Sequence, residues 1–258
     1  MTHPPFAVEG LEGIAPIDVR HLTMRYGPRV VMRDLTFAVT RGEVFVILGG
    51  SGCGKSTMLR HLVGLDEPLG GSITIDGIAP TESISGRPQF GVMFQSGALL
   101  GSLSVGENVA LPLQEWTELP LDAIGGIVAA KLRLVGLQRA EGQLPSELSG
   151  GMRKRAAIAR AMALEPDLLF LDEPSAGLDP VSAVELDELI LDLNRQLGLT
   201  FVVVTHDLES IFKIGGSCIM LDRESQSIIA RGDPHALRDT SQDPRVHSFF
   251  NRTPQVTS

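Results

Sequence analysis

The sequence predicts an α/β protein with a parallel-sheet core, and three observations lead to this class. Short apolar runs at residues 43–48, 167–172 and 200–205 have the length and composition of strands buried on both faces of a sheet. Between the last two, residues 183–197 carry apolar side chains at helical spacing. A glycine-rich loop, residues 49–56, follows the first run. Strand–helix–strand order at this spacing is typical of a parallel sheet covered by helices.

An antiparallel β subdomain is expected near the start of the chain. Residues 1–14 are rich in Pro and Gly and predict a loosely ordered N-terminal tail. Strand-like runs follow at residues 17–22, 35–39 and 72–75, separated by turn-rich segments. Several short strands with turns between them are typical of antiparallel pairing.

Residues 97–165 interrupt this pattern and predict an inserted α-helical subdomain. The centre of the segment, residues 121–137, is an amphipathic helix, although Gly125 and Gly126 lower its helix propensity. We expect the main domain to span residues 15–232.

Residues 233–258 predict a polar C-terminal tail with one apolar feature. Phe249 and Phe250 stand side by side in this segment. An aromatic pair in a polar tail indicates docking on some surface, and a second copy of the chain is one candidate.

Composition narrows the function classes. The net charge of -9 disfavours general nucleic-acid binding, because an acidic surface repels phosphates. Cys53 and Cys218 are the two cysteines, too few for a disulfide framework, which favours a reducing compartment. The N-terminus lacks the cationic start and apolar run of a signal peptide. The uncharged stretch 88–106 is interrupted by glycine, serine and glutamine, so no transmembrane helix is expected there. The chain is therefore expected to be soluble and cytoplasmic.

Residues 49–56, GGSGCGKS, match the phosphate-binding pattern G-x-x-x-x-G-K-[ST]. The pattern lies between a predicted strand and a predicted helix over residues 55–65, which is the context that it requires. Glycines let successive backbone N–H groups face one anion, and Lys55 is expected to reach the β- and γ-phosphates. The alternative is a flexible glycine turn. The nucleotide-binding residues expected here are Gly49, Gly50, Ser51, Gly52, Cys53, Gly54, Lys55, Ser56 and Thr57.

The strand at 167–172 ends in two adjacent carboxylates, Asp172 and Glu173. Asp172 is placed to hold Mg²⁺ together with Ser56 of the glycine-rich loop. Glu173 is placed to orient or deprotonate a water molecule in line with the γ-phosphate. Two carboxylates at a strand end are weak evidence alone, because strands often end in carboxylates at solvent. They indicate a Mg²⁺ site here because the chain also has the glycine-rich loop.

Residues 148–164 open a predicted helix with a serine and two glycines, followed by three cations. The cations are Arg153, Lys154 and Arg155. Positive charge is unfavourable there because the helix macrodipole is already positive at its N-terminus. Either contact with nucleic acid or a smaller anion at the helix N-terminus explains these cations, and the net charge of the chain disfavours nucleic acid. Ser149, Gly150 and Gly151 therefore predict an anion-receptive helix N-terminus.

In order, these motifs resemble the ATPase subunits of ABC transporters over residues 17–232. The resemblance is carried by Tyr26, the loop 49–56, Gln95, LSGG (148–151), LLFLDE (168–173), SAGLD (175–179) and His206. Alone, Tyr26, Gln95 and His206 have ordinary structural explanations. Each follows a strand-like run, where α/β ligand sites form. The resemblance implies the P-loop NTPase fold of ABC ATPases, with ATP and Mg²⁺ as cofactors.

The resemblance also implies the role of each residue in ATP hydrolysis. Tyr26 would stack on adenine, and Gln95 would ligate Mg²⁺ and sense the γ-phosphate. Glu173 would activate water, and His206 would contact the γ-phosphate.

For the LSGG residues, the resemblance implies a second copy of the chain. Ser149, Gly150 and Gly151 would bind ATP held by the P-loop of that copy, and Asp179 would lie at the dimer seam. The residues alone leave open a site that works within one copy. Met152 departs from the glutamine of many ABC ATPases.

The same resemblance implies membrane partners and excludes nucleic acid as a partner. Without a span of its own, the chain would reach the cytoplasmic face of the inner membrane only through integral permease subunits. Leu99 and Leu100 are candidates for a groove that receives a permease helix, and ordinary subdomain core is the alternative.

Three segments are similar in sequence to ATPases of Mce-type and lipid-asymmetry systems: residues 94–113, 148–180 and 243–252. This implies phospholipid transport between the inner membrane and the outer envelope, with an Mce-domain partner. A small-solute importer and a cell-division ATPase without transport are the alternatives.

Overall fold

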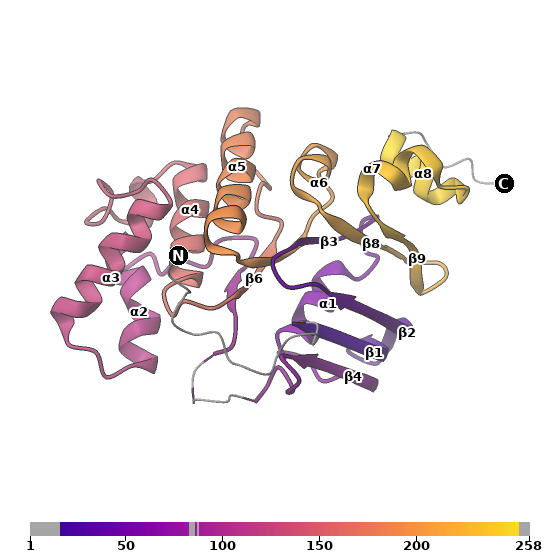
Figure 1. Cartoon of the computed structure of the whole chain (residues 1–258), viewed down its shortest axis with the longest axis horizontal. Helices are drawn as coiled ribbons and strands as arrows, with labels where there is room; N and C mark the ends of the chain where they lie inside the picture. Colours follow the sequence, from indigo (N-terminus) through magenta and orange to yellow (C-terminus); the bar gives the residue numbers. More distant parts are fainter. Residues whose placement is uncertain (1–15, 83–85, 87, 253–258) are drawn as a thin grey trace, which may run out of the picture.

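A six-stranded sheet forms the centre of the chain, which is described by a computed structural model over residues 16–82, 86 and 88–252 (Figure 1). In spatial order its strands are β5 (Gly91–Met93), β6 (Leu168–Asp172), β7 (Thr200–Val204), β3 (Val44–Gly49), β8 (Ser217–Asp222) and β9 (Ser227–Gly232). The first five run parallel and β9 runs antiparallel to β8. The predicted parallel core is confirmed. Strands β5, β8 and β9 were not predicted: β5 has three residues and β9 is only partly buried, whereas β8 is as long as β3 and largely buried, and its apolar run was missed.

Strand β3 is buried along its whole length, which explains its continuous apolar sequence. Phe45 and Ile47 contribute to the core shared with the antiparallel sheet. Val46 and Leu48 point to the other face, where they contact the C-terminal helices. The alternation places successive side chains in two different cores.

A three-stranded antiparallel sheet covers one face of the central sheet, as predicted (Figure 1). Its order is β2 (Arg29–Val39), β1 (Ile17–Tyr26) and β4 (Gly70–Ile75), so β1 and β2 are longer than expected. Helix α1 (Lys55–Leu62) packs between the two sheets and buries Met58, Leu59 and Leu62.

Helices α2 (Val105–Trp116), α3 (Leu121–Leu134) and α4 (Gly150–Ala161) lie within the predicted inserted segment. Helix α3 buries Ile124, Val128 and Leu132, one turn apart each. Gly125 and Gly126 face open space, since an added Cβ would meet no atom within 4 Å. The two glycines are therefore tolerated on the exposed side of the helix.

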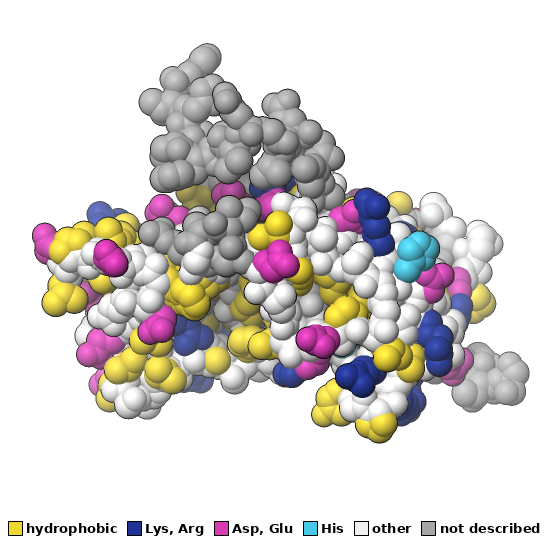
Figure 2. Space-filling view, turned by 90° about the horizontal axis from the view of Figure 1, so that it is seen from below, with side chains coloured by type: hydrophobic (Ala, Val, Ile, Leu, Met, Phe, Trp, Pro, Cys, Tyr) yellow, Lys and Arg dark blue, Asp and Glu magenta, His cyan; other side chains and the backbone are white. Residues whose placement is uncertain are grey.

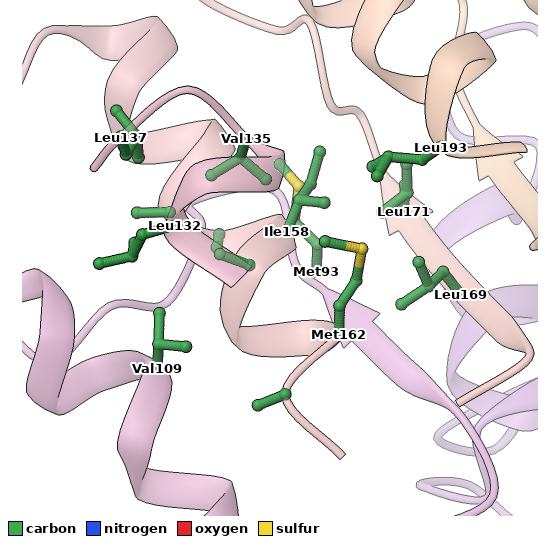
Figure 3. Close-up of a cluster of buried hydrophobic side chains, with 14 of the residues drawn as sticks. Met93, Val109, Leu132, Val135, Leu137, Ile158, Met162, Leu169, Leu171 and Leu193 are labelled. Atoms are coloured by element: carbon green, nitrogen blue, oxygen red, sulfur yellow. The ribbon is translucent and has the colours of Figure 1, made fainter. Parts of the chain in front are cut away.

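Helix α4 connects the inserted helices to the central sheet (Figure 3). Ile158 and Met162 lie between Leu132 of α3 and Leu169 of β6, within one buried cluster. Because this contact is apolar on both sides, α4 and the sheet edge are expected to move as one unit.

The C-terminal segment is helical and packs on the chain itself. Helices α5 (Pro180–Leu197) and α6 (Leu208–Ile214) cover the sheet and are followed by α7 (Pro234–Thr240) and α8 (Pro244–Asn251) (Figure 1). Phe250 is 3% exposed and joins the cluster of Leu48 and Leu208. The aromatic pair thus docks within one copy, rather than needing a second one to bury it.

Within the described residues, no helix is long and apolar enough to cross a bilayer. The predicted tail at 1–14 lies outside the described residues, as do residues 253–258 of the C-terminal segment.

Candidate functional site

The loop between β3 and α1 adopts a conformation that requires glycine. Gly49, Gly52 and Gly54 have φ values of 147°, 71° and 105°. A Cβ on Gly49 would collide with the carbonyl oxygen of Leu221, and one on Gly54 would lie 2.6 Å from Val31 Cγ1. Residues 49–56 thus have the strand–loop–helix arrangement of a phosphate-binding loop.

Lys55 folds back over this loop. Its Nζ donates to the carbonyl oxygens of Gly49 (2.9 Å) and Gly50 (3.3 Å). Ser56 and Thr57 stand in the first turn of α1, which has no acidic residue, so free N–H groups and the helix dipole favour an anion. Cys53 is buried beneath the loop, which leaves its backbone as the part available to a phosphate.

Asp172 lies at the carboxyl end of β6 with an unsatisfied oxygen. The residue is buried, and Oδ1 has no hydrogen-bond partner among the described residues. Burial, and then the charge of Glu173, raise the pKa of Asp172 above its ordinary value. A buried orphan carboxylate oxygen fits a cation ligand, because such atoms are normally satisfied.

Glu173 follows in a strained conformation that its neighbours hold. Its φ is 47°, in the left-handed region, and its N–H donates to Val204 (2.8 Å). Its Oε1 lies 2.7 Å from His206 Nδ1, and Thr205 Oγ1 donates to Oε2 (3.3 Å). When the carboxylate is ionised, Nδ1–H donates to it and Nε2 is left for another partner. The structure therefore brings Glu173 and His206 together.

The three cations of α4 all have partners inside the chain. Arg153 Nη1 donates to Leu148 O (2.6 Å), and Arg155 Nη2 pairs with Glu185 (2.6 Å). Lys154 is buried and donates to the carbonyl oxygens of Gln95 (2.5 Å) and Glu173 (3.2 Å). Each of these cations thus has a partner within one copy, and an anion at the helix N-terminus stays a prediction.

Ser149 and Asp179 begin two helices that lie next to each other. Ser149 accepts from Met152 N (3.2 Å) at α4, and Asp179 accepts from Ser182 N (3.0 Å) at α5. A Cβ on Gly150 would lie 3.0 Å from Leu178, just before Asp179. No hydrogen bond in the described parts of the chain joins these residues to the loop 49–57. The two groups of predicted site residues are therefore not joined by hydrogen bonds in the described parts of one copy.

Tyr26 ends β1 and is 69% exposed, so its ring is available for stacking. Gln95 is exposed in the turn after β5. Sequence reasoning missed Thr205 and Lys154 as site neighbours. The first has a signal, since it precedes His206 in VVVTHD, whereas nothing local predicts the inward direction of Lys154.

The ABC transporter family model matches residues 32–176. The Haemophilus influenzae protein named "intermembrane phospholipid transport system ATP-binding protein MlaF" is 42% identical over 91% of this chain and 89% of its own length. Its Escherichia coli K12 counterpart is 40% identical over 91% and 88%. The Mycobacterium tuberculosis H37Rv "probable ribonucleotide transport ATP-binding protein mkl" is 41% identical over 96% of this chain and 70% of its own length.

Solved structures agree with the fold. The protein cbiO1 of Clostridium perfringens, part of the ABC transporter complex cbiONQ, superposes with a TM-score of 0.79 at 29% identity, covering 88% of this chain and 92% of that one. A dimeric ATP-binding cassette in a post-hydrolysis state, bound to ADP and Pi, gives 0.72 at 29% identity, covering 83% and 97%. With the P-loop geometry and the identity of these relatives, this chain belongs to the ABC transporter family, as an ABC ATPase.

Proposed function

We propose that this chain is the ATP-hydrolysing subunit of a phospholipid transporter that works between the inner membrane and the outer envelope. The observation that carries the ATPase site is the contact of Glu173 with His206, beside the orphan oxygen of Asp172. Glu173 accepts a proton from water, and His206 Nε2 contacts the γ-phosphate. Lys55 and the loop N–H groups hold the phosphates, and Tyr26 stacks on adenine.

Asp172, Ser56 and Gln95 are proposed to hold Mg²⁺, which neutralises charge on the β- and γ-phosphate oxygens when bound. Mg²⁺ is usually held by one or two carboxylates together with phosphate oxygens and water. The described residues include no group of three His, Cys, Asp or Glu side chains that could hold a metal ion. With Asp172 as its one proposed carboxylate ligand, the site suits Mg²⁺, which takes its other ligands from phosphate oxygens and water.

Two copies are proposed to enclose two ATP molecules. Ser149, Gly150 and Gly151 of one copy complete the site at the P-loop of the other, and Asp179 lies at the seam. The dimeric cassette described above supports this arrangement.

Glu173→Gln tests the catalytic assignment. ATP affinity is expected to stay within about threefold, while kcat falls by about a hundredfold or more and a dimer accumulates with ATP. The measurements are ATP-analogue fluorescence titration, phosphate release and gel filtration. Glu115→Gln, on the exposed side of α2, is the matched control. Turnover at the wild-type rate in Glu173→Gln would remove Glu173 from the role of base.

Permease subunits are proposed to contact the segment at Leu100. Leu100 is 46% exposed, whereas Leu99 packs against the helical core. The buried Asn108 side chain holds this loop through hydrogen bonds to both backbone groups of Leu100. A fixed loop that presents one leucine fits a groove for a short helix.

Exposed apolar side chains also occur at the end of the molecule where α2 and α3 lie (Figure 2). Its exposed side chains include Leu111, Trp116, Leu119, Leu121 and Leu134. On the face in Figure 2, Lys and Arg side chains are interspersed with Asp and Glu. This mixed charge argues against direct binding to nucleic acid. Attachment to the cytoplasmic face is proposed to occur through the permeases.

The domain division proposed with this function is a tail at 1–14, the ATPase domain at 15–232 with its helical subdomain at 97–165, and a C-terminal segment at 233–258. Helices α7 and α8 pack with α6 and with strands β3 and β8 in one core cluster, so the segment after Gly232 is docked on the ATPase domain.

Reconstitution tests the substrate. The complex copurified from its own cells is expected to contain permeases and an Mce-domain subunit, and to transfer labelled phospholipid only with ATP. Transfer should fail with Glu173→Gln. The name of the mycobacterial relatives refers to ribonucleotides, so labelled ribonucleotide is the parallel substrate. Uptake of ribonucleotide or another small solute without lipid transfer would overturn the lipid assignment. A complex that moves neither would favour the cell-division alternative, and the ATPase assignment would stand in both cases.

A further inference from the structure

Lys154 is a buried cation that the proposed phosphate sites do not use. It is 7% exposed, although lysine is rarely buried without partners. Burial lowers the pKa of Lys154, while the charges of Asp172 and Glu173 oppose that shift. A buried ammonium with defined acceptors is costly to disturb, because losing them leaves a charge unsatisfied.

The two acceptors of Lys154 belong to different parts of the candidate site. Gln95 O, at 2.5 Å, belongs to the turn after β5, and Glu173 O, at 3.2 Å, follows the end of β6. Both acceptors are main-chain atoms, so the bonds fix the backbone paths rather than side-chain rotamers. Glu173 is the residue with the strained φ of 47°, which needs outside support to persist.

Helix α4 holds the Gln95 segment at a second point. Arg160 Nη1 donates to Ala98 O (2.7 Å), and Nη2 donates to Gly97 O (2.9 Å). A Cβ on Gly97 would lie 3.4 Å from that of Ala157, so the segment runs directly along α4. Of the two cations, Lys154 is the one that also reaches Glu173.

The far end of α4 is fixed in the apolar cluster of Figure 3, through Ile158 and Met162. The N-terminal end of α4 begins at Ser149, where the predicted contact with the second copy starts. A displacement of this N-terminal end is therefore transmitted to Lys154, about one turn along the helix.

We propose that Lys154 is a positioning residue that holds the main chain of Gln95 and Glu173 in one arrangement with helix α4. This rests on the proposed function of Glu173 and Gln95. Contact of Ser149–Gly151 with nucleotide on a second copy would then set the γ-phosphate-sensing glutamine and the water-activating glutamate together. Lys154 acts on the rate of the chemical step through these two residues and touches neither ATP nor water.

The test uses the full chain with Lys154→Met, which keeps the length of the stem and removes the donors. The expected result is a fall in kcat of about tenfold or more, with the affinity for a fluorescent ATP analogue within about threefold of wild type. Lys154→Arg, which restores donors and charge, should recover kcat to within about threefold. Arg155→Met is the matched control, since Arg155 is the next cation on α4 and pairs with Glu185.

Amide hydrogen exchange without nucleotide gives a second measurement. Peptides that cover residues 95–98 and 173–176 should both exchange faster in Lys154→Met than in Arg155→Met. A kcat within about twofold of wild type, a loss of analogue affinity equal to the loss of kcat, or unchanged exchange in both peptides would each overturn the proposal. If Lys154→Met does not fold, the same comparisons apply to Lys154→Gln, whose amide ends one bond short of the ammonium.

Glu173→Gln separates this inference from the proposed function. A normal rate in Glu173→Gln rejects the assignment of the site itself. A lost rate in Glu173→Gln with a normal rate in Lys154→Met rejects only the positioning role.

Discussion

Gly54→Ala is expected to destabilise the fold and the phosphate loop together. Gly54 has φ 105° and lies immediately before Lys55, at the N-terminus of α1. An L side chain rarely adopts that conformation, and holding one there costs about 1–3 kcal/mol. The added Cβ would also lie 2.6 Å from Val31 Cγ1, and overpacking of this kind costs about 1–3 kcal/mol. Because the loop can relax, we expect a loss of about 2–4 kcal/mol of the free energy of unfolding.

Urea unfolding followed by circular dichroism measures this loss, and a double-mutant cycle separates its two causes. The other two atoms near the added Cβ lie at 3.9 Å, so the Val31 methyl is the one serious obstacle. Val31→Ala should therefore recover about 1–2 kcal/mol in the Gly54→Ala background and leave the conformational cost in place. Gly50→Ala is the control, since its Cβ would meet nothing within 4 Å, and its stability should change by about 0.5 kcal/mol or less. A loss below about 1 kcal/mol in Gly54→Ala, or no coupling with Val31, would refute the reasoning.

Three further predictions concern ATP, coupling and pH. Lys55→Ala should weaken binding of a fluorescent ATP analogue by about tenfold or more, because the charge held over the loop is lost; unchanged affinity would contradict the phosphate-cradle role. Leu100→Asp should abolish lipid transfer by the reconstituted complex, while ATP hydrolysis by the isolated chain stays within about twofold of wild type. Leu197→Asp, at an exposed position on α5, is the control. Intact lipid transfer in Leu100→Asp would show that Leu100 is an ordinary surface residue. Burial raises the pKa of Asp187 to about 6, compared with 3.8 in the unfolded chain. The ionised carboxylate therefore lowers the stability of the fold above about pH 6. This loss of stability disappears as the pH falls toward 3.8. Asp187→Asn, which keeps partners for Ser210, should therefore be more stable than wild type by about 1–3 kcal/mol near pH 7.5 and about equal near pH 4 in urea unfolding; a difference independent of pH would show that the charge is not the cause.

The sequence by itself determined the class of the fold and most of the candidate site. Strands β3, β6 and β7 and helix α5 were predictable because their apolar periodicity is local and needs no partner to be recognised. The glycine-rich loop was predictable for the same reason, since its backbone requirements are met by neighbouring residues in one motif. The antiparallel sheet was predictable in kind, although its register and the full length of β1 and β2 depend on pairing.

The tertiary structure decided which polar groups are buried and what they contact. In sequence, Lys154 stands between two other cations and looks like them, yet it alone is buried against the carbonyls of Gln95 and Glu173. Asp187 lies on α5 among other carboxylates, and only the packing of α6 buries it against Ser210. Phe250 could have met a second copy, but the chain folds back and covers it. Burial and hydrogen-bond partners depend on residues far away in the sequence. A local sequence pattern therefore does not predict which polar side chain of a helix the rest of the chain will bury.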